Sequence, residues 1–571
     1  MSDIKTLVDW ALHWEKATPD QLHFIQPLGG SSTNLQTWTF AQAVREARRM
    51  AAYLRSLELP PKSRIAICSK NCVHWLLSDW AIAMADHVSV PLYPNLTPST
   101  VRYILELSDT RLLFVGKLDP IWQEMKSGVP DSVRRVAFPL APAGEEPRWD
   151  QLIAGHEPLS NVAQRTLEET ATIVYTSGST GQPKGVMLSF GAMARATEGI
   201  CQLLDLSARD RMLSYLPLAH TMERWLVGCG STRAGYQVFF ADSVDSFVQD
   251  LKRARPTLFL SVPRLWQKFQ SGVFQKLPQK KLERLLRIPI VSGFIKRKIL
   301  KGLGLDKVRV AGSGSAPMPE ELMAWYRALG LELLEGYGMS ENFNYSHVSR
   351  PGHVRVGYVG TPEPGVECKI SPEGEILVKS PGSMLGYLKQ PNETREAFTE
   401  DGFLRTGDCG SLDEQGRLKI TGRVKEIFKT SKGKYVAPAP IEGLIVNHPH
   451  IEQCCVSGAG QPQPYALIVL TRDAWALLKA GPEASRDEPG AGKAAIEKEL
   501  IEHLAKVNSG LEPTEQMSFF CVVKDEWATE NGFLTPSLKI KRARIEEAYA
   551  AYVPGWYAQR SKLVWAGAKS S

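Results

Sequence analysis

The chain has 571 residues, of which 43% are hydrophobic and 23% charged, values close to the average for folded globular proteins, so global disorder is excluded. Its 68 basic and 61 acidic residues give a net charge of +7, which supports nucleic-acid binding only if the basic residues gather on one face. Nine scattered cysteines form no metal-ligand pattern, so we expect buried thiols in a reducing compartment.

The chain shows no predicted membrane span or secretion signal. Its first residues are amphipathic and carry acidic side chains, unlike the basic start of a signal peptide. The most apolar stretch, residues 76–92, is interrupted by Asp79 and Asp86. We therefore expect a cytoplasmic protein that is soluble or contacts a membrane only peripherally.

From residue 36 to about residue 420, short β-branched segments alternate with longer segments of helical period. The predicted strands are 64–69, 89–93, 172–176, 211–216, 236–240, 257–262, 307–313 and 331–337. The predicted helices between them include 40–57, 75–85 and 191–204. Strands separated by helices predict parallel sheets with helices on their faces, so this part is a large α/β body.

Two smaller units are expected after the main α/β pattern. Around residue 350 the pattern changes to short strands between glycine-rich turns, which predicts a β-rich subdomain. After Arg423 a shorter α+β unit follows, with strands at 453–459, 466–471 and 518–523 and a helix at 495–506. Residues 481–493 are polar and rich in Gly and Pro, so we expect a flexible surface insertion there.

The first chemical motif follows the predicted strand at 172–176. Its small hydroxyl and glycine residues let backbone N–H groups approach phosphate oxygens, and a lysine adds positive charge. The residues of this candidate phosphate loop are Thr176, Ser177, Gly178, Ser179, Thr180, Gly181 and Lys184. A Walker A loop is excluded, because Lys184 lies between Pro183 and Gly185 instead of following Gly and preceding Ser or Thr.

The segment TIVYTSGSTGQPKGVMLS at 172–189 resembles the signature of the adenylate-forming superfamily, which includes acyl-CoA synthetases, firefly luciferases and peptide-synthetase adenylation domains. The resemblance extends along nearly the whole chain. It implies a large N-terminal body of α/β subdomains plus a β-rich subdomain, with a small mobile C-terminal α+β domain. The form of residues 214–225, 69–94 and 435–442 looks most like long-chain fatty acyl-CoA synthetases.

The resemblance implies roles for residues in two further motifs. SYLPLAHTMERW at 214–225 looks like the motif that places His220 beside the carboxylate being activated. The adenine and acyl pockets would be lined by Gly314, Ser315, Ala316, Pro317, Glu335, Gly336, Tyr337, Gly338 and Ser340. Tyr337 would stack on adenine, Ser340 would contact the α-phosphate, and Thr180 and Glu341 would bind Mg²⁺. Trp225 and the neighbourhood of Gly314 either line the acyl tunnel or are ordinary core.

The resemblance also predicts a hinge between two domains. Asp408 in LRTGD would accept hydrogen bonds from both ribose hydroxyls, and Arg423 would contact the ribose or phosphates. The hinge would be 423–425, with Lys425 at the pivot, between an N-terminal domain of residues 1–422 and a C-terminal domain of residues 426–571. Lys429 matches a position that some members use in the second half-reaction.

The C-terminal segment GFLTPSLKIKR at 532–542 is similar to the loop that carries the superfamily's catalytic lysine. The motif aligns this lysine on Lys539, and Lys541 is a nearby competitor. Many members have Gly immediately before the lysine, whereas this chain has Leu538.

The implied reaction is activation of a fatty acid by ATP and Mg²⁺ to an acyl-adenylate, followed by transfer to coenzyme A. Two alternatives stay open: an acyl-AMP ligase that loads a carrier protein, and a non-catalytic, membrane-associated protein that binds nucleotide or acyl chains. Oligomeric state cannot be inferred.

The basic excess lies in one segment. Residues 276–309 hold eleven basic residues against Glu283 and Asp306, a net charge of +9, so the rest of the chain carries −2. Their apolar stripes predict basic amphipathic helices broken near Pro289 and Gly293, which either contact an anionic membrane or pack on the body. Because this charge is local and interleaved with apolar residues, nucleic acid is not an expected partner.

Overall fold

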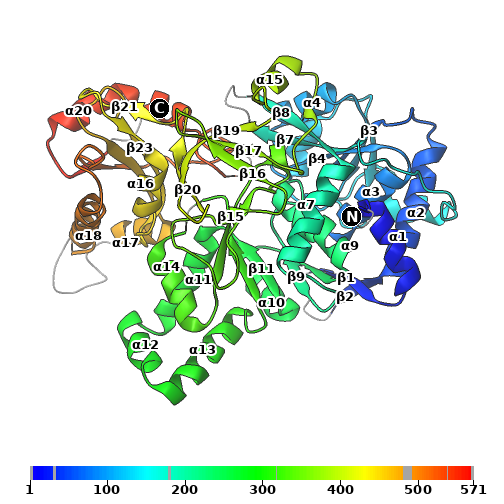
Figure 1. Cartoon of the computed structure of the whole chain (residues 1–571), viewed down its shortest axis with the longest axis horizontal. Helices are drawn as coiled ribbons and strands as arrows, with labels where there is room; N and C mark the ends of the chain where they lie inside the picture. Colours follow the sequence, from blue (N-terminus) through cyan, green and yellow to red (C-terminus); the bar gives the residue numbers. More distant parts are fainter. Residues whose placement is uncertain are drawn as a thin grey trace.

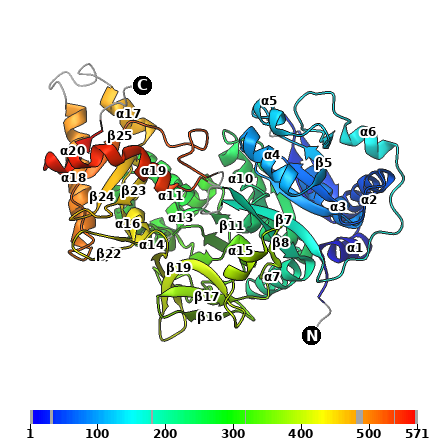
Figure 2. The same cartoon turned by 90° about the horizontal axis from the view of Figure 1, so that it is seen from above.

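Five β-sheets organise the described part of the chain, and two large sheets form its centre (Figure 1). The structure is a computed structural model that describes residues 4–29, 34–177, 182–316, 318–479, 491–535 and 538–566. We refer to the residues up to 422 as the body and to those from 426 onward as the C-terminal domain. Seen from above, the C-terminal domain lies beside the body, and its sheet is separate from both large sheets (Figure 2).

The first large sheet has nine strands and is parallel through its centre, with antiparallel strands at both edges. In spatial order its strands are β15 (Thr361–Pro362), β14 (His347–Val348), β13 (Leu333–Tyr337), β12 (Val310–Ser313), β11 (Leu258–Ser261), β9 (Arg211–Ser214), β10 (Gln237–Phe240), β1 (Leu22–Pro27) and β2 (Leu35–Thr39). The parallel centre confirms the prediction of an α/β body.

The second large sheet has seven strands, and it is parallel except at one edge, where β8 is antiparallel to both β7 and β18. In spatial order they are β6 (Arg134–Ala137), β5 (Thr110–Val115), β3 (Arg64–Cys68), β4 (Val88–Leu92), β7 (Thr170–Ser177), β8 (Pro183–Ser189) and β18 (Gly386–Tyr387). Strands β7 and β8 form the hairpin whose connection is the candidate phosphate loop.

A layer of helices lies between the two large sheets. Helix α3 (Val73–Met84) is buried along all 12 of its residues, and it contacts β3 and β4 of one sheet and β1 of the other. Helix α7 (Phe190–Leu203) contacts β8 and a π-helical turn at Arg224–Gly230. A helix that is apolar all round is stable only when it is enclosed, and the two sheets enclose α3.

The body contains thirteen further helices among the described residues. They are α1 (Leu7–Ala17), α2 (Phe40–Ser56), α4 (Pro98–Leu107), α5 (Trp122–Met125), α6 (Trp149–Ala154), α8 (Thr221–Glu223), α9 (Ser231–Ala234), α10 (Phe247–Ala254), α11 (Pro263–Lys276), α12 (Gln279–Leu286), α13 (Pro289–Leu303), α14 (Glu320–Leu329) and α15 (Pro391–Glu396). Short 3₁₀ turns occur at Lys126–Gly128, Ser340–Asn342 and Ala550–Tyr552.

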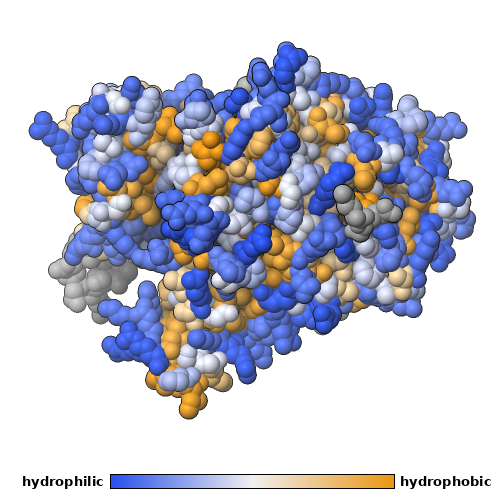
Figure 3. All heavy atoms as spheres, viewed as in Figure 1, coloured by the Kyte–Doolittle hydropathy of each residue, from blue (hydrophilic) through white to orange (hydrophobic). Residues whose placement is uncertain are grey.

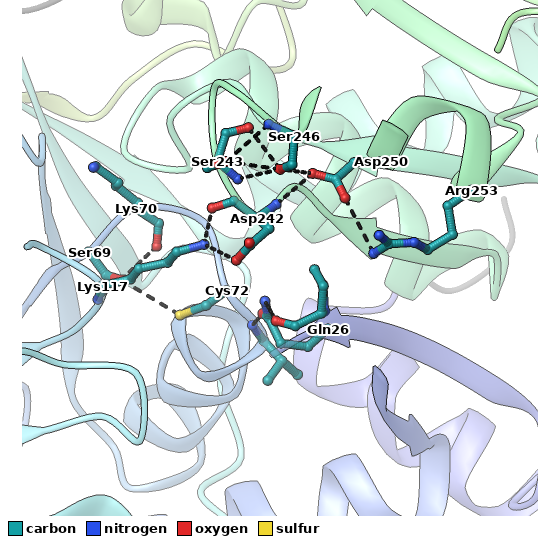
Figure 4. A network of polar contacts seen from close by, with 12 residues as sticks. Gln26, Ser69, Lys70, Cys72, Lys117, Asp242, Ser243, Ser246, Asp250 and Arg253 are labelled. Atoms are coloured by element: carbon teal, nitrogen blue, oxygen red, sulfur yellow. Dashed lines mark hydrogen bonds and ion pairs between the residues drawn. The ribbon is translucent and has the colours of Figure 1, made fainter. Parts of the chain in front are cut away.

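A polar network joins loops that follow the carboxyl ends of strands in the two large sheets (Figure 4). Lys117, which follows β5, donates from Nζ to the carbonyl of Asp242, which follows β10. The backbone N–H of Asp242 donates to the buried carboxylate of Asp250 on α10 at 2.9 Å. These contacts hold the two halves of the body together at the edge where the site lies.

The predicted β-rich subdomain is a four-stranded antiparallel sheet. Its strands are β16 (Glu367–Ile370), β17 (Glu375–Lys379), β19 (Leu404–Leu412) and β20 (Leu418–Arg423). Asp408 on β19 pairs directly with Arg423 on β20, at the end of the body. The sheet therefore places these two predicted ribose-binding residues side by side.

The C-terminal domain has its own four-stranded sheet and two apolar cores. Its strands are β23 (Ile451–Ser457), β24 (Tyr465–Leu470), β25 (Phe520–Val523) and β26 (Leu563–Trp565), preceded by the hairpin β21 (Phe428–Lys429) and β22 (Tyr435–Val436). Its helices are α16 (Pro438–Ile445), α17 (Arg472–Lys479), α18 (Ala491–Ser509), α19 (Arg542–Tyr549) and α20 (Val553–Ala558).

Several expectations need correction or completion. The chain already contributes helix α1 and strand β1 before residue 36, where strand β2 has just begun, and residues 183–189 form β8 where no strand was expected. Gly293 does not break the basic segment but lies inside α13, whereas Pro289 does begin that helix. Of the predicted insertion at 481–493, residues 481–490 lie outside the described residues, and the last three begin α18.

Two expectations from composition are confirmed. All nine cysteines are free thiols, and eight of them are buried. Within the described residues, none of the helices combines the length and the hydropathy of a bilayer-spanning segment.

Candidate active site

The candidate phosphate loop connects β7 to β8. Thr176 pairs with Lys184 in this hairpin, so Lys184 lies on a strand and not in the loop itself. Its ammonium nitrogen lies 4.9 Å from the centre of the Tyr387 ring on β18. Backbone pairing of Ser177 with Pro183 closes the described part of the hairpin. The predicted residues Gly178, Ser179, Thr180 and Gly181 lie outside the described residues.

Glu341, a predicted Mg²⁺ ligand, contacts the same tyrosine as Lys184, namely Tyr387. The Tyr387 hydroxyl donates a hydrogen bond to Glu341 Oε1 at 3.0 Å. The Glu341 side chain is buried, and this burial raises the pKa of its carboxyl, although the Tyr387 hydrogen bond lowers it. Because Tyr387 is neutral, the buried Glu341 carboxylate would be stabilised by a bound cation.

Asp408 is held by two residues from different strands. Tyr337 at the end of β13 donates from its hydroxyl to Asp408 Oδ2 at 2.7 Å. Arg423 Nε lies 2.9 Å from the other carboxylate oxygen, Oδ1. The carboxylate is thus oriented by charge-assisted contacts on both sides, and lone pairs stay available on each oxygen for further donors.

His220 begins the short helix α8, and its Nδ1 accepts a hydrogen bond from the backbone N–H of Met222 at 3.1 Å. Burial lowers its pKa to about 4, and the positive charge of Lys539 adds to this effect. The imidazole is therefore neutral at pH 7, and with Nδ1 accepting, its proton is on Nε2. Next to it, the Thr221 and Ser340 hydroxyl oxygens lie 3.4 Å apart.

Lys539 reaches this region from the C-terminal domain, at the end of a tight loop. Its backbone N–H donates to Thr535 Oγ1 at 3.0 Å, and its carbonyl accepts from the Thr535 N–H at 2.8 Å. The side chain keeps some exposure to solvent, yet surrounding protein lowers the pKa of its ammonium group, as does Arg423. Asp408 and Glu341 act in the opposite direction, so the charge of Lys539 is coupled to groups on the body.

Two details of this loop bear on the choice between the two lysines. Leu538 adopts φ = 62°, the left-handed region that glycine adopts without strain. This geometry explains why a glycine suits the position before Lys539. Lys541 instead precedes α19 as its N-cap residue, and its backbone N–H donates to the Phe533 carbonyl.

The remaining predicted residues of the nucleotide pocket follow β12 and β13. Glu335 accepts a hydrogen bond from the Met318 N–H at 3.0 Å, and burial raises its pKa to about 7. Gly338 has no room for a side chain, since a Cβ would lie 2.4 Å from the Asn344 carbonyl oxygen. Gly314, Ser315 and Ala316 follow β12, Gly336 lies within β13, and Pro317 lies outside the described residues.

Two predicted residues lie away from these contacts. Lys429 is on the β21–β22 hairpin, where its ammonium nitrogen lies 5.6 Å from the Tyr435 ring centre. Trp225 is buried in the π-helical turn, with its ring edge-on to Tyr345 at 6.2 Å. A Cβ at Gly314 would come within 2.8 Å of the Met222 Cε, so Gly314 borders the segment that carries His220.

Sequence reasoning missed the residues that hold the His220 segment in place. Asn71, which follows β3, donates from Nδ2 to the carbonyl of Leu216 at 2.6 Å and accepts the N–H of Leu218 at 3.1 Å. Glu223 accepts from the Ser214 hydroxyl and the Tyr215 N–H, both at 2.9 Å.

A buried ion pair lies beside this segment. Arg224 Nη2 contacts both oxygens of Asp79 on α3, at 2.5 and 2.8 Å, with both side chains almost fully buried. The available signal was the pair of charged residues 223 and 224 in an otherwise apolar motif; nothing local pointed to Asn71 or Tyr387.

Comparisons with known proteins match the chain in two parts. The model of the AMP-binding enzyme family matches residues 12–388, and that of the AMP-binding enzyme C-terminal domain matches residues 425–561. The long-chain-fatty-acid–CoA ligase FadD15 of Mycobacterium bovis is 30% identical, covering 95% of each chain. Long-chain-fatty-acid–CoA ligase 1 of Cavia porcellus is also 30% identical, over 88% of this chain and 79% of its own length.

Solved structures agree on the fold. The adenylation domain of a carboxylic acid reductase from Segniliparus rugosus, in complex with AMP and a co-purified carboxylic acid, superposes with a TM-score of 0.77 at 23% identity, over 98% of this chain and 95% of that one. The o-succinylbenzoate CoA synthetase of Bacillus subtilis, with its acyl-adenylate intermediate, gives 0.72 at 22% identity, over 94% and 97%. With two-thirds of its length matched by one family model and the fold shared, the chain belongs to the AMP-binding enzyme family.

Proposed function

We propose that the protein activates a long-chain fatty acid with ATP, releasing pyrophosphate, and then transfers the acyl group to coenzyme A with release of AMP. The observation that carries this proposal is that Lys539 of the C-terminal domain lies near three residues of the body: Asp408 and Glu341 favour the charged form of its ammonium group, and its own charge lowers the pKa of His220. The curated relatives named long-chain-fatty-acid–CoA ligases, matched along 95% of the chain, support the choice of substrate.

In the first step, a carboxylate oxygen of the fatty acid attacks the α-phosphorus of ATP, and pyrophosphate leaves. Lys539 supplies a positive charge where the attacking carboxylate and the α-phosphate approach, which offsets their mutual repulsion. His220, neutral at pH 7, offers an Nε2–H donor to the same carboxylate without adding charge. Ser340 lies beside this point and would donate to the α-phosphate.

Residues of four strands would position the nucleotide. Asp408 would accept hydrogen bonds from the two ribose hydroxyls, with Tyr337 and Arg423 fixing its orientation. Lys184 and the backbone of the β7–β8 connection would hold the terminal phosphates. Such positioning and charge compensation are the main contributions that proteins make to this type of transfer.

The residues fit a bound Mg²⁺. Glu341 offers a buried carboxylate. Among the described residues no cluster of three or more acidic, His or Cys side chains could hold a metal on protein ligands alone, so substrate oxygens would have to complete the site. Mg²⁺ is commonly bound by one or two carboxylates together with substrate phosphates, and that pattern suits Glu341. The sequence motif adds Thr180, which lies outside the described residues. When bound, Mg²⁺ would neutralise phosphate charge. Tyr387 would keep the Glu341 carboxylate oriented toward it.

In the second step, the coenzyme A thiolate attacks the acyl carbonyl carbon, and AMP leaves with the oxygen that it gained from the acid. The thiol approaches from a different direction, so the site has to be rearranged between steps. We propose residues 423–425 as the hinge between the body and the C-terminal domain. Rotation there would withdraw Lys539 and bring other residues of the C-terminal domain, Lys429 among them, toward the body.

The test is acid-dependent ATP–pyrophosphate exchange across a ladder of fatty acids, followed by thioester formation with coenzyme A. The proposal expects exchange with long chains and a thioester when coenzyme A is added. If no acid supports exchange, the proposed activity is wrong and the protein is the non-catalytic alternative, which binds nucleotide or acyl chains. Exchange without a coenzyme A thioester would favour a carrier protein as the acceptor.

A further inference from the structure

Helices α12 and α13 form a hairpin that projects from the body, away from both large sheets (Figure 1). The base of the hairpin is anchored. Leu300 and Leu303 of α13 pack against the apolar core that contains Leu251 of α10, and Gly304 leaves no room between α13 and the α10 backbone. Leu282 of α12 is buried. The hairpin is therefore a formed element whose far end has no covering partner among the residues that the structure describes.

The tip of the hairpin is apolar. Ile290 is 91% exposed, Phe294 67% and Ile288 48%, so three large apolar side chains within seven residues face solvent. Figure 3 shows this tip as a hydrophobic patch at the end of the projection, with hydrophilic surface on its flanks. Single exposed apolar side chains are common on soluble proteins, but a cluster at a protruding tip marks an interaction surface.

The flanks of the tip are strongly basic. Residues 279–303 hold eight basic side chains against the single acidic residue Glu283, a net charge of +7. The basic residues are Lys280, Lys281, Arg284, Arg287, Lys296, Arg297, Lys298 and Lys301. Among the described residues none of the eight forms an ion pair, whereas Arg309 and Arg255, just outside the hairpin, pair with Asp210 and Asp306.

These two properties together select one kind of partner. An apolar tip surrounded by unpaired cations matches the interface of an anionic bilayer, where acyl chains lie below negative headgroups. A nucleic acid would satisfy the cations but would leave Ile290 and Phe294 in water. Packing on the body would satisfy the apolar residues, yet the structure leaves them exposed.

We propose that the α12–α13 hairpin docks this protein on anionic membrane surfaces, with Ile288, Ile290 and Phe294 inserted at the headgroup boundary and the eight cations around them. The docking would hold the protein where a lipid substrate is concentrated, a consequence that rests on the proposed function. The docking itself does not depend on catalysis and is measured without substrates.

The test is co-sedimentation of the whole chain with vesicles of phosphatidylcholine, alone or mixed with phosphatidylglycerol, at low and high salt. The expected result is binding to the mixed vesicles that weakens with salt. The tip variant is Ile290→Ser with Phe294→Ser, and the cation variant replaces Lys280, Lys281, Arg284 and Arg287 with Gln. Each variant should weaken binding by about tenfold or more, since one cation near the surface contributes on the order of fivefold.

Matched control variants come from the C-terminal domain. Leu477→Ser with Tyr552→Ser removes apolar side chains that are 50% and 46% exposed, and substituting Gln at Lys498, Lys524, Arg560 and Lys562 removes four exposed cations. Both controls should bind like the wild type. All variants should keep their thermal midpoints and their ATP–pyrophosphate exchange activity on soluble short acids. Vesicle binding then reports on the docking alone and exchange on the proposed function, so the failure of one is distinguished from the failure of the other.

Four results would overturn the proposal: no binding to mixed vesicles, equal binding to neutral vesicles, unchanged binding of the tip variant, or equal loss in the controls. Two further measurements address other partners. A dimer in sedimentation velocity that the tip variant abolishes would assign the surface to a second copy. Displacement from vesicles by duplex DNA, with direct DNA binding that the tip variant leaves unchanged, would assign it to nucleic acid.

Discussion

The polar contacts inside the body are buried, whereas those between the body and the C-terminal domain are largely exposed. Between the two large sheets, Arg224 and Asp79 form a buried ion pair, and Asn71 holds the His220 segment from the neighbouring sheet. Across the domain contact, Arg264 on α11 pairs with the half-buried Glu452, and Lys506 pairs with Glu321, the other three side chains being exposed. Buried pairs are costly to break and exposed pairs contribute little.

This difference suits a reaction in two steps. The groups that orient the carboxylate and the nucleotide have to stay fixed through both steps, and they come from the interior. In the proposed reaction the C-terminal domain, which carries Lys539, leaves after the first step, and its polar contacts with α11 and α14 are exposed enough to exchange for water.

Removal of one partner of the buried ion pair should destabilise the body strongly. Arg224→Ala leaves the Asp79 carboxylate buried without its cation, which should lower the free energy of unfolding by roughly 3–5 kcal/mol. Arg264→Ala at the domain contact should cost less than about 1 kcal/mol. Urea denaturation of both variants measures this. Similar losses in the two variants would contradict the contrast between the two regions.

Lys539→Ala should lower the rate of acid-dependent ATP–pyrophosphate exchange by about 10²- to 10³-fold, the usual effect of removing a donor aimed at developing charge. Transfer of the acyl group from purified acyl-adenylate to coenzyme A should change much less, because in the proposed reaction Lys539 has left the site by then. The matched variant is Lys541→Ala, which should retain exchange. A reversed pattern between the two lysines would move the catalytic role to Lys541.

Glu223 gives a pH test of the interior. Burial raises the pKa of its carboxyl to about 8, against 4.5 in the unfolded chain. Between these values the folded chain holds a proton that the unfolded chain has released, so this group's contribution to stability is lost as the pH rises. Glu223→Gln keeps an acceptor and removes the titration. Relative to the wild type, its free energy of unfolding should gain on the order of 3 kcal/mol from pH 5 to pH 8.

A different pH dependence would contradict the raised pKa of Glu223. If denaturation at several pH values shows a constant difference between Glu223→Gln and the wild type, the carboxyl titrates normally in the folded chain. The network around the His220 segment would then be charged at pH 7.

The smallest effect concerns the loop of Lys539, the proposed catalytic lysine. Leu538 is in the left-handed region, where a side chain costs roughly 1–2 kcal/mol. Leu538→Gly removes this strain but gives the unfolded chain more freedom, so a gain of about 1 kcal/mol or less is expected in thermal unfolding. A clear loss of stability would mean that the Leu538 side chain has a packing role.

Much of this site could be read from the sequence because its motifs are local. The strands at 172–176, 211–216 and 331–337 and the loops that follow them were recognisable from alternating apolar residues and small polar turns. The pairing of β1 with β10 could not be predicted, because it joins residues more than 200 positions apart. The same holds for Asn71 and Tyr387, whose roles depend on which loops the topology brings together. Strand β8 was missed because its Pro and Gly residues suggested only a loop.

The central claim, acyl transfer through an adenylate, is tested most directly with a fatty acid whose carboxyl oxygens are both ¹⁸O. The account predicts that one ¹⁸O appears in the phosphate of AMP for each coenzyme A thioester formed, and none in pyrophosphate, as measured by mass spectrometry. In that route the carboxylate oxygen bonds to the α-phosphorus and stays there when the thiolate displaces AMP. Thioester formation with unlabelled AMP, or with ADP as the product, would contradict the account.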